Sequence, residues 1–398
     1  MAIVTGAAPA RADDGAQGFA ACLDELASVA RVEGIPETLV DGVLAGLEFQ
    51  PRVIELDRAQ PEFQQTFAAY LRGRVSTVRV ERGRVLLAQH RELLDGLTRE
   101  YGVPGHYLVA LWGMESDFGR FTGRTPILDS LATLACDERR SAFFRDELMT
   151  ALRLIERESL APSAMLGSWA GAMGQTQFMP SAYYAHAVDG DGDGRIDLWH
   201  SPADALASGA NLLASLGWNR GQRWGREVSL AADFPFEKSG IEQPRALVDW
   251  AELGVRRADG AALPVADLSA RLLLPMGHAG PAFLVYDNFD VLLGWNRSSS
   301  FAIAVGHLAD RIAGAGALHA DMPDDGAMAI AETARLQRRL AELGFSPGEA
   351  DGILGPATRS ALRKFQLDRG LIADGYPDER TRAALVEAGD TPAGHSEM

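Results

Sequence analysis

The spacing of apolar residues divides the chain into a long helical part, a β-prone part and a second helical part. Apolar positions recur every three or four residues over residues 18–102, and this helical pattern continues to about Trp218. Residues 226–296 contain short β-prone runs bounded by Gly, Pro and Asp, such as Ala270–Leu274 and Ala282–Tyr286. The pattern therefore predicts a mainly helical, α+β protein that contains a small β-rich subdomain.

The C-terminal part follows a segment of simple composition. A helix is expected at about Ser299–Ala313, and residues 314–330 are rich in Ala, Gly and Asp, which predicts a linker. Beyond it, an Asp-Gly turn signal occurs twice, at Asp351-Gly352 and at Asp374-Gly375. In both copies Thr follows seven residues after Asp and an Ala-Leu pair comes next, as in a turn that leads into a capped helix. With one preceding helix, the repeat predicts a three-helix module over residues 331–390.

Composition and charge narrow the classes of function. The 398 residues include 38 Lys and Arg against 54 Asp and Glu, a net charge of −16, and 47% of them are hydrophobic. This acidity argues against general binding of nucleic acids or anionic membranes, because both require basic patches. The sequence contains no run of 18 or more apolar residues, so no membrane-spanning helix is predicted.

The first residues and the two cysteines bear on location. Residues 1–12 end in Ala10-Arg11-Ala12, the small-x-small pattern of a signal-peptidase site, but lack the basic start of a complete signal. We interpret them as the residual tail of an export signal, with an ordinary frayed terminus as the alternative. Cys22 and Cys136 either form a disulfide in an oxidising compartment or remain two buried thiols, because sequence gives no distance between them.

A carboxylate interrupts an apolar helix face in the first helical part. Leu108, Leu111 and Trp112 precede Glu115 at helical spacing, and Gly119 is placed to end the helix. Burial and a nearby helix C-terminus both disfavour the charged carboxylate, which favours the protonated form that a general acid needs. A half-buried Glu paired with an Arg is the alternative interpretation.

The residues around this carboxylate resemble a known enzyme family. Trp112–Arg120 resembles the catalytic motif of the B-type lytic murein transglycosylases, glycoside hydrolase family 103. Leu128–Leu134, with Arg139-Arg140 after it, resembles the segment that lines the substrate groove of that family. Gly167–Ser181 resembles its longest signature, and Trp295-Asn296 stands where the family commonly has Tyr-Asn.

The resemblance covers roughly residues 18–313 and implies a lysozyme-like helical catalytic domain over residues 13–313. It implies cleavage of the MurNAc-β-1,4-GlcNAc bond of peptidoglycan without water. Glu115 would protonate the leaving oxygen and then, as a base, take the proton of the muramyl C6 hydroxyl, which closes a 1,6-anhydroMurNAc ring. Ser168 would orient the substrate acetamide, and Gln177 and Asn296 would be further positioning groups.

The chemistry of the same segments suits a glycan. Neutral groups that can hydrogen-bond to hydroxyls and acetamides belong to Ser168, Gln175 and Gln177. Guanidinium groups that can meet lactyl or peptide carboxylates belong to Arg139 and Arg140. Gly171 and Gly174 lack side chains, which would allow a sugar polymer to approach the backbone closely. Aromatic rings that could stack on sugars, besides Trp295, belong to Trp112, Trp169, Phe178, Tyr183 and Tyr184.

An acidic loop follows these segments. Positions 1, 3, 5 and 9 of the front of an EF-hand calcium loop are matched by Asp189, Asp191, Asp193 and Asp197. Position 12 is His200 instead of Glu, whereas Asp204 matches the closing carboxylate of the family with an offset of one residue. A solvated acidic turn is the alternative. We expect a structural Ca²⁺ ion held by Asp189, Asp191, Asp193, the carbonyl of Arg195 and Asp204.

The C-terminal module resembles the peptidoglycan-binding domain that is often appended to cell-wall hydrolases. The matching residues are Leu336-Gln337, Leu343-Gly344-Phe345, Asp351-Gly352, Gly355, Thr358, Phe365-Gln366 and Gly370-Leu371. Most are core or turn positions, so they identify the fold and not a binding site. Together the resemblances predict an exported, periplasmic lytic transglycosylase that acts on peptidoglycan strands, with other cell-wall enzymes as candidate partners.

Three other functions stay open at this stage. A catalytically silent wall-binding or scaffolding protein would keep the fold, although the presence of Glu115 argues against it. A lysozyme-like muramidase would hydrolyse the same bond and leave reducing ends. A calcium sensor is disfavoured, because the single loop lacks the usual partner hand and closing Glu.

Overall fold

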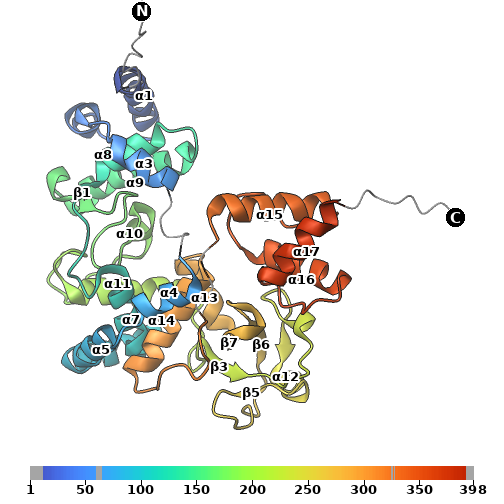
Figure 1. The fold of residues 1–398 in the computed structure, drawn as a ribbon. Helices are drawn as coiled ribbons and strands as arrows, with labels where there is room; N and C mark the ends of the chain where they lie inside the picture. The colour runs from blue at the N-terminus through green and yellow to red at the C-terminus, as the bar shows by residue number, and fades with distance from the viewer. Residues whose placement is uncertain (1–11, 60–64, 324–325, 327, 391–398) are drawn as a thin grey trace, which may run out of the picture. The chain divides into compact units, whose positions relative to one another are not determined.

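The structure, a computed structural model, describes residues 12–59, 65–323, 326 and 328–390 (Figure 1). The signal-peptide tail predicted over residues 1–12 lies outside the described residues, except for Ala12, which begins helix α1. The chain divides into two compact units. The first comprises Met1–Gln60, His90–Tyr101 and Leu111–Leu212, and the second comprises Pro61–Gln89, Gly102–Ala110 and Leu213–Met398.

The first unit is helical, as predicted from the spacing of its apolar residues. Its helices are α1 (Ala12–Val32), α2 (Glu37–Gly42), α3 (Pro51–Ala59), α6 (Arg91–Tyr101), α8 (Ile127–Ala135), α9 (Ser141–Glu158), α10 (Pro180–His186) and α11 (Pro202–Ser215). Helix α8 is apolar on nearly every face, so all of its residues except Asp129 are buried, and it packs against α9. Two short antiparallel strands, β1 (Thr125–Pro126) and β2 (Leu166–Gly167), complete the unit together with the 3₁₀ turns Leu44–Gly46 and Pro162–Ala164.

A disulfide bond joins α1 to the residue that follows α8. Cys22 and Cys136 are 114 positions apart in sequence, and their Cα atoms lie 5.9 Å from each other. Of the two alternatives that the sequence left open, the structure therefore has the crosslink. The loop that it closes contains Glu115.

The second unit contains the β-rich part. Its strands are β3 (Gly225–Ser229), β4 (Arg245–Ala246), β5 (Arg256–Arg257), β6 (Ser269–Leu273) and β7 (Ala282–Val285). They form one antiparallel sheet in the order β4-β6-β7-β3-β5. All four residues of the central strand β7 are buried, in keeping with its unbroken apolar sequence. The two β-prone runs predicted from sequence match β6 and β7 to within a residue.

The second unit also contains helices that precede, interrupt or follow these strands along the chain. They are α4 (Phe67–Arg74), α5 (Thr77–Gln89), α12 (Leu247–Glu252), α13 (Asp287–Trp295) and α14 (Ser299–Ile312), with 3₁₀ turns at Phe236–Lys238 and Gly277–Ala279. Helix α14 confirms the helix expected at about residues 299–313, and Ser298 caps it by accepting a hydrogen bond from Phe301 N–H.

The connection to the last module is attached to the sheet. The described part of residues 314–329 contains no helix or strand, as expected for a linker. The carboxylate of Glu227 in β3 nevertheless accepts hydrogen bonds from the N–H groups of His319 and Ala320 at 2.8–2.9 Å. The connection is therefore fixed to the second unit at this point.

The C-terminal module has the predicted three helices, α15 (Ile330–Glu342), α16 (Pro356–Asp368) and α17 (Glu379–Asp390). A buried Gln organises each Asp-Gly turn of the repeat. Gln337 donates to Asp351 Oδ1, Thr358 Oγ1 and the Ile353 carbonyl and accepts from Gly352 N–H. The corresponding bonds of the second repeat join Gln366 to Asp374, Thr381, Tyr376 and Gly375.

The second of these turns lies against the β-rich part of the same unit. Asp374 is 3% exposed, and its Oδ2 accepts hydrogen bonds from the backbone N–H of His278 at 2.9 Å and from its ring. Arg359 donates to the carbonyls of Leu274 and Pro275 at 3.2 and 3.0 Å, and Arg363 forms an ion pair with Glu242. Asp351, the counterpart of Asp374 in the first repeat, is exposed.

Candidate active site and metal loop

Helix α7 (Gly105–Ser116) carries the candidate general acid near its C-terminus. The sequence predicted burial of one face, but every residue from Tyr107 to Met114 is buried, because the helix is apolar on all sides. Glu115 is half-buried and lies in the last turn. A helix that is buried from Tyr107 to Met114 thus carries Glu115 in its last turn, where the backbone carbonyls have no partner within the helix.

Two hydrogen bonds from neighbours of Glu115 converge on Gln175. Trp112 Nε1 donates to Gln175 Oε1 at 2.8 Å, and Ser116 Oγ donates to the Gln175 carbonyl at 2.6 Å. Trp112 and Ser116 are 4% and 1% exposed, so both bonds are shielded from water. They fix the turn of α7 that carries Glu115 from both sides.

The backbone around this turn adopts rare conformations. Asp117, Phe118 and Gln177 have positive φ values of 51°, 63° and 50°. Among the non-glycine residues that the structure describes, Ser159 is the only other one with a positive φ. Gly119 has φ 79°, and a Cβ atom there would lie 2.4 Å from Gln175 Oε1. Such strain persists only where the surrounding contacts over-determine it, and it is concentrated at functional sites.

Ser168 and Gln177 lie in the segment between β2 and α10, and both are half-buried. Ser168 Oγ accepts a hydrogen bond from Ala172 N–H at 3.0 Å, which leaves the hydroxyl hydrogen available to a ligand. Gln177 Nε2 donates to the carbonyls of Thr122 and Gly174, which leaves Oε1 as the atom that can accept from a ligand.

Gln175 occupies a different place from the one the sequence suggested. It is 4% exposed, its Oε1 accepts from Trp112, and its Nε2 donates to the Trp199 carbonyl at 3.2 Å. Both ends of the amide are therefore used inside the protein. The structure thus buries, against α7 and Trp199, the amide group that the sequence predicted to bind substrate.

Two other chemical arguments from the sequence are wrong in detail. Cβ atoms on Gly171 and Gly174 would lie 2.5 Å from Leu131 Cδ2 and from the Leu198 carbonyl, so these glycines make room for protein and not for sugar. Phe178 and Tyr183 are 2% and 0% exposed, as befits core residues. Of the aromatic candidates in this segment, Trp169 is half-buried and Tyr184 is exposed, whereas Trp112 is buried beside Gln175.

Arg139 and Arg140 also have partners that sequence did not reveal. Both form ion pairs with Asp57 of α3, whose side chain is 4% exposed. Sequence reasoning missed Asp57, because 82 positions separate it from Arg139 and no local pattern marks it. The side chains of Arg139 and Arg140 are still 41% and 42% exposed, so their binding of substrate carboxylates stays a prediction.

Trp295 and Asn296 lie in the second unit, at the C-terminus of α13. Trp295 is half-buried, while Asn296 is exposed and its Oδ1 accepts a hydrogen bond from Ser298 N–H at 3.1 Å. This bond fixes the turn into α14.

The acidic loop brings three carboxylates together. Oxygen atoms of Asp189, Asp191 and Asp204 lie within 4.8 Å of one another. Asp204 is 1% exposed, and its two oxygens accept from Gly190 N–H and Asp197 N–H at 2.8 and 2.7 Å. Hydrogen bonds from backbone amides, first that of Gly194, lower the pKa of Asp189. Three converging carboxylates are a donor set that suits Ca²⁺.

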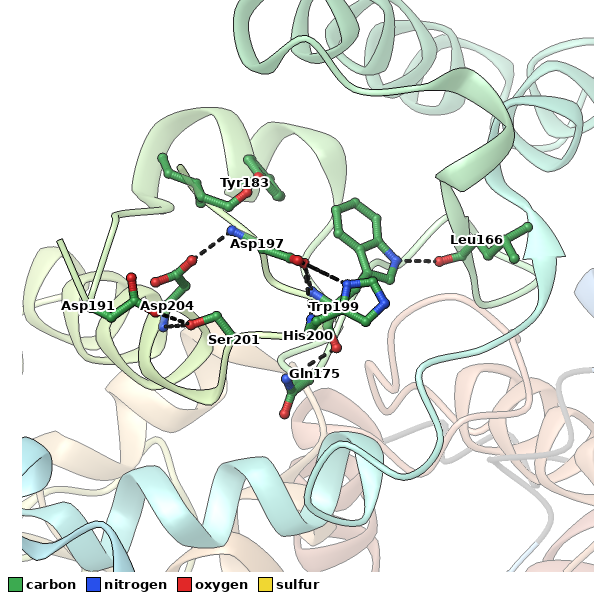
Figure 2. Close-up of polar contacts among 10 residues, drawn as sticks. Leu166, Gln175, Tyr183, Asp191, Asp197, Trp199, His200, Ser201 and Asp204 are labelled. Carbon is green, nitrogen blue, oxygen red and sulfur yellow. Dashed lines mark hydrogen bonds and ion pairs between the residues drawn. The ribbon is translucent and has the colours of Figure 1, made fainter. Parts of the chain in front are cut away.

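Figure 2 shows polar contacts that Asp191, Asp197 and Asp204 make in this loop. Asp193 is exposed and accepts from Arg195 N–H at 2.8 Å, and neither residue belongs to the close cluster of three. Asp197 accepts from Trp199 N–H and His200 N–H, and His200 is 85% exposed at position 12 of the loop. Trp199, which sequence reasoning did not single out, connects the loop to Gln175 and to Leu166.

Comparison with known proteins places this site in a family. Residues 18–310, which include α7, the Gly167–Ser181 segment and the acidic loop, match the family model described as Transglycosylase SLT domain. The chain belongs to this transglycosylase family. Residues 331–385 match the model of a peptidoglycan binding domain, in agreement with the three-helix module.

Solved structures of SLT transglycosylases are similar to most of this chain. SltB3 from Pseudomonas aeruginosa, in complex with NAG-anhNAM-pentapeptide, has 42% identity and a TM-score of 0.88, and the match covers 93% of this chain and all of that one. The Escherichia coli lytic transglycosylase Slt35 in complex with calcium has 31% identity and a TM-score of 0.63, over 75% of this chain and 92% of that one.

A curated SLT transglycosylase is similar over a shorter stretch. Membrane-bound lytic murein transglycosylase B of Escherichia coli (strain K12) is 35% identical over 237 residues, or 59% of this chain. The match spans 64% of the length of that relative.

Proposed function

We propose that this chain is a lytic murein transglycosylase that cleaves the MurNAc-β-1,4-GlcNAc bond of peptidoglycan and leaves 1,6-anhydroMurNAc ends. The observation that carries the proposal is the placement of Glu115, held in the last turn of a buried helix by neighbours that both bond to Gln175. The similarity to SltB3, solved with a NAG-anhNAM-pentapeptide ligand, supports the anhydro product.

One carboxylate performs the reaction. Hydrolases that retain or invert configuration use two acidic groups. The two acidic residues nearest to Glu115 in sequence, however, already have partners. Asp117 pairs with Arg120 at 3.1 Å, and Asp129 accepts from Glu48 N–H at 2.8 Å. Glu115 donates its proton to the leaving glycosidic oxygen and then accepts the proton of the muramyl C6 hydroxyl, whose oxygen attacks the anomeric carbon. The same group thus serves as acid and then as base.

Substrate positioning falls to groups with an atom left for a ligand. The Ser168 hydroxyl donates to the carbonyl of the muramyl acetamide, which orients that group against the anomeric carbon. Gln177 accepts through Oε1, and Asn296 offers its amide nitrogen.

The test replaces Glu115 by Gln, which keeps the shape and removes the transferable proton. On purified sacculi, mass spectrometry should find anhydromuropeptides with the parent chain and at least a 100-fold slower release with Glu115→Gln. Equal rates would refute the assignment of the general acid. Reducing-end products from the parent would instead establish a lysozyme-like hydrolase.

We also propose that the acidic loop binds a structural Ca²⁺ ion through Asp189, Asp191, Asp193, the carbonyl of Arg195 and Asp204. The three converging carboxylates and the calcium complex of Slt35 support this. The ion supplies two positive charges among carboxylates that otherwise repel one another. Calorimetry should detect Ca²⁺ binding to the parent and not to Asp204→Asn, and the melting temperature should fall on chelation. Absence of both effects would refute the site.

The remaining proposals concern organisation and location. We propose a catalytic domain over residues 13–313, a linker over residues 314–330 and a wall-binding module over residues 331–390 that holds the enzyme on glycan strands. The disulfide bond supports export to an oxidising compartment, here the periplasm, because such bonds are rare in the cytosol. None of the helices in the described part of the chain is long and apolar enough to cross a membrane.

A further inference from the structure

The acidic loop is connected to the segment that carries Trp199 by direct hydrogen bonds. Asp204 Oδ2 accepts from Asp197 N–H at 2.7 Å, and Asp197 Oδ1 accepts from Trp199 N–H at 2.9 Å (Figure 2). The other oxygen of Asp204 accepts from Gly190 N–H at 2.8 Å, so this buried carboxylate is held at both of its oxygens. The position of residues 197–199 is thus set by a residue of the proposed metal site.

The same residues bind the segment before Gln177. The Leu198 carbonyl accepts from Gln175 N–H at 2.8 Å, and the Trp199 carbonyl accepts from Gln175 Nε2 at 3.2 Å. Gly174 packs so closely against Leu198 that a Cβ atom would lie 2.5 Å from the Leu198 carbonyl. Gln175 is therefore held through both its backbone and its side chain.

From there, two branches reach the candidate catalytic groups. Through Trp112 and Ser116, Gln175 fixes the turn of α7 that carries Glu115. Trp199 Nε1 donates to the Leu166 carbonyl at 2.7 Å, two residues before Ser168 (Figure 2). Residues 197–199 are thus the element that joins the metal loop to both sides of the candidate site.

We propose that Gln175 and Trp199 are positioning residues that couple Ca²⁺ binding in the loop to the alignment of Glu115 and Ser168. The inference rests on the proposed transglycosylase function and on the proposed metal site. Without a cation, the carboxylates of the loop repel one another and the buried Asp204 carboxylate lacks a counter-charge. The orientation of residues 197–199 then loosens, and Gln175 loses two of its partners together.

Coupling of this kind is measurable as a change in binding. If Ca²⁺ and a muropeptide favour the same arrangement, each must raise the affinity of the protein for the other by the same factor. We expect Ca²⁺ to tighten binding of NAG-anhNAM-pentapeptide to Glu115→Gln by about fivefold or more, the lower end of measured couplings. The Glu115→Gln background prevents turnover during the titrations.

The variant Gln175→Met keeps the length of the side chain and removes both amide hydrogen bonds. In the Glu115→Gln background it should still bind Ca²⁺ and the muropeptide, with the coupling factor reduced to less than twofold. Gln243→Met is the matched control, because the Gln243 side chain likewise makes two hydrogen bonds, here as donor to the carbonyls of Glu237 and Ser239, and lies outside the chain of bonds. This control should keep the full factor.

The outcomes separate the proposals. A parent coupling factor near one, or an unchanged factor in Gln175→Met, would overturn the coupling, whereas anhydro products from the Ca²⁺-loaded parent would still establish the proposed function. If Gln175→Met does not fold, Trp199→Phe replaces it, since it removes only the bond to Leu166. The proposed role of Trp199 would also be overturned if the coupling factor is unchanged in Trp199→Phe while Ser168→Ala weakens binding of the muropeptide.

Discussion

Replacing Cys22 and Cys136 by Ser removes the crosslink between α1 and the end of α8. The two residues are 114 positions apart, so the bond closes a loop of about 115 residues in the unfolded chain. The chain-entropy relation for a loop of that size gives roughly 16 cal/mol/K, or about 5 kcal/mol at 25 °C. We expect the measured loss in the free energy of unfolding to be about 3–5 kcal/mol, because unfolded chains retain some structure.

Urea denaturation followed by circular dichroism and tryptophan fluorescence gives this quantity for the parent and for the double variant. Reduced parent is the matched control, because it lacks the same crosslink and keeps both sulfur atoms. Thiol titration in denaturant should find no free thiol in the untreated parent and two after reduction, since the sequence has only two Cys.

Two results would refute this reasoning. A loss of less than about 1 kcal/mol in the double variant would show that the crosslink does not restrict the unfolded chain as the relation requires. A reduced parent as stable as the oxidised parent would show the same. If the variant is less stable but the reduced parent is not, the effect belongs to the serine side chains.

Three further predictions concern single sites. Gly119→Ala should lower the free energy of unfolding by about 1–3 kcal/mol, because the backbone φ there is 79° and the new Cβ would lie 2.4 Å from Gln175 Oε1. It should also slow catalysis. Denaturation measures the first effect and a sacculus assay the second. Burial, with a contribution from Arg311, lowers the pKa of His307 to about 4 from 6.5. The unfolded chain therefore binds a proton at this residue near pH 6.5, whereas the folded chain binds it only near pH 4. The free energy of unfolding should fall by about 3 kcal/mol as the pH is lowered from 6.5 to about 4. His307→Gln should flatten this pH dependence in urea titrations. Gln337→Leu should lower the free energy of unfolding by about 2–4 kcal/mol, because it removes the four hydrogen bonds of a buried amide in the C-terminal module; the unfolding transition of this variant measures the loss.

The fold could be predicted where one local signal decides the structure. Strands β6 and β7 and helix α14 follow from short apolar runs and their spacing, and the Asp-Gly repeat located both turns of the C-terminal module. Helix α7 was predicted as a helix, but its burial on all sides from Tyr107 to Met114 was not, since burial depends on elements far away in sequence. The resemblance to a known family also found the general-acid candidate.

Polar partners could not be predicted in the same way. The ion pairs of Arg139 and Arg140 with Asp57, which belongs to another helix, have no local signal in the sequence. Gln175 looked like a substrate ligand because glutamine suits sugars, yet packing buries it between α7 and Trp199. The partner of a polar group is set by tertiary packing, and one sequence contains no record of that packing.

The docked turn of the C-terminal module limits how far this module is portable. Grafting residues 331–385 onto another protein would uncover Asp374, which is 3% exposed here, and would leave Arg359 without its two carbonyl partners. Desolvation lowers the pKa of Arg359 to about 10, so the guanidinium still carries its charge into this contact. An engineer who wants a free-standing wall anchor from this chain must therefore redesign the surface of the second repeat and can keep that of the first.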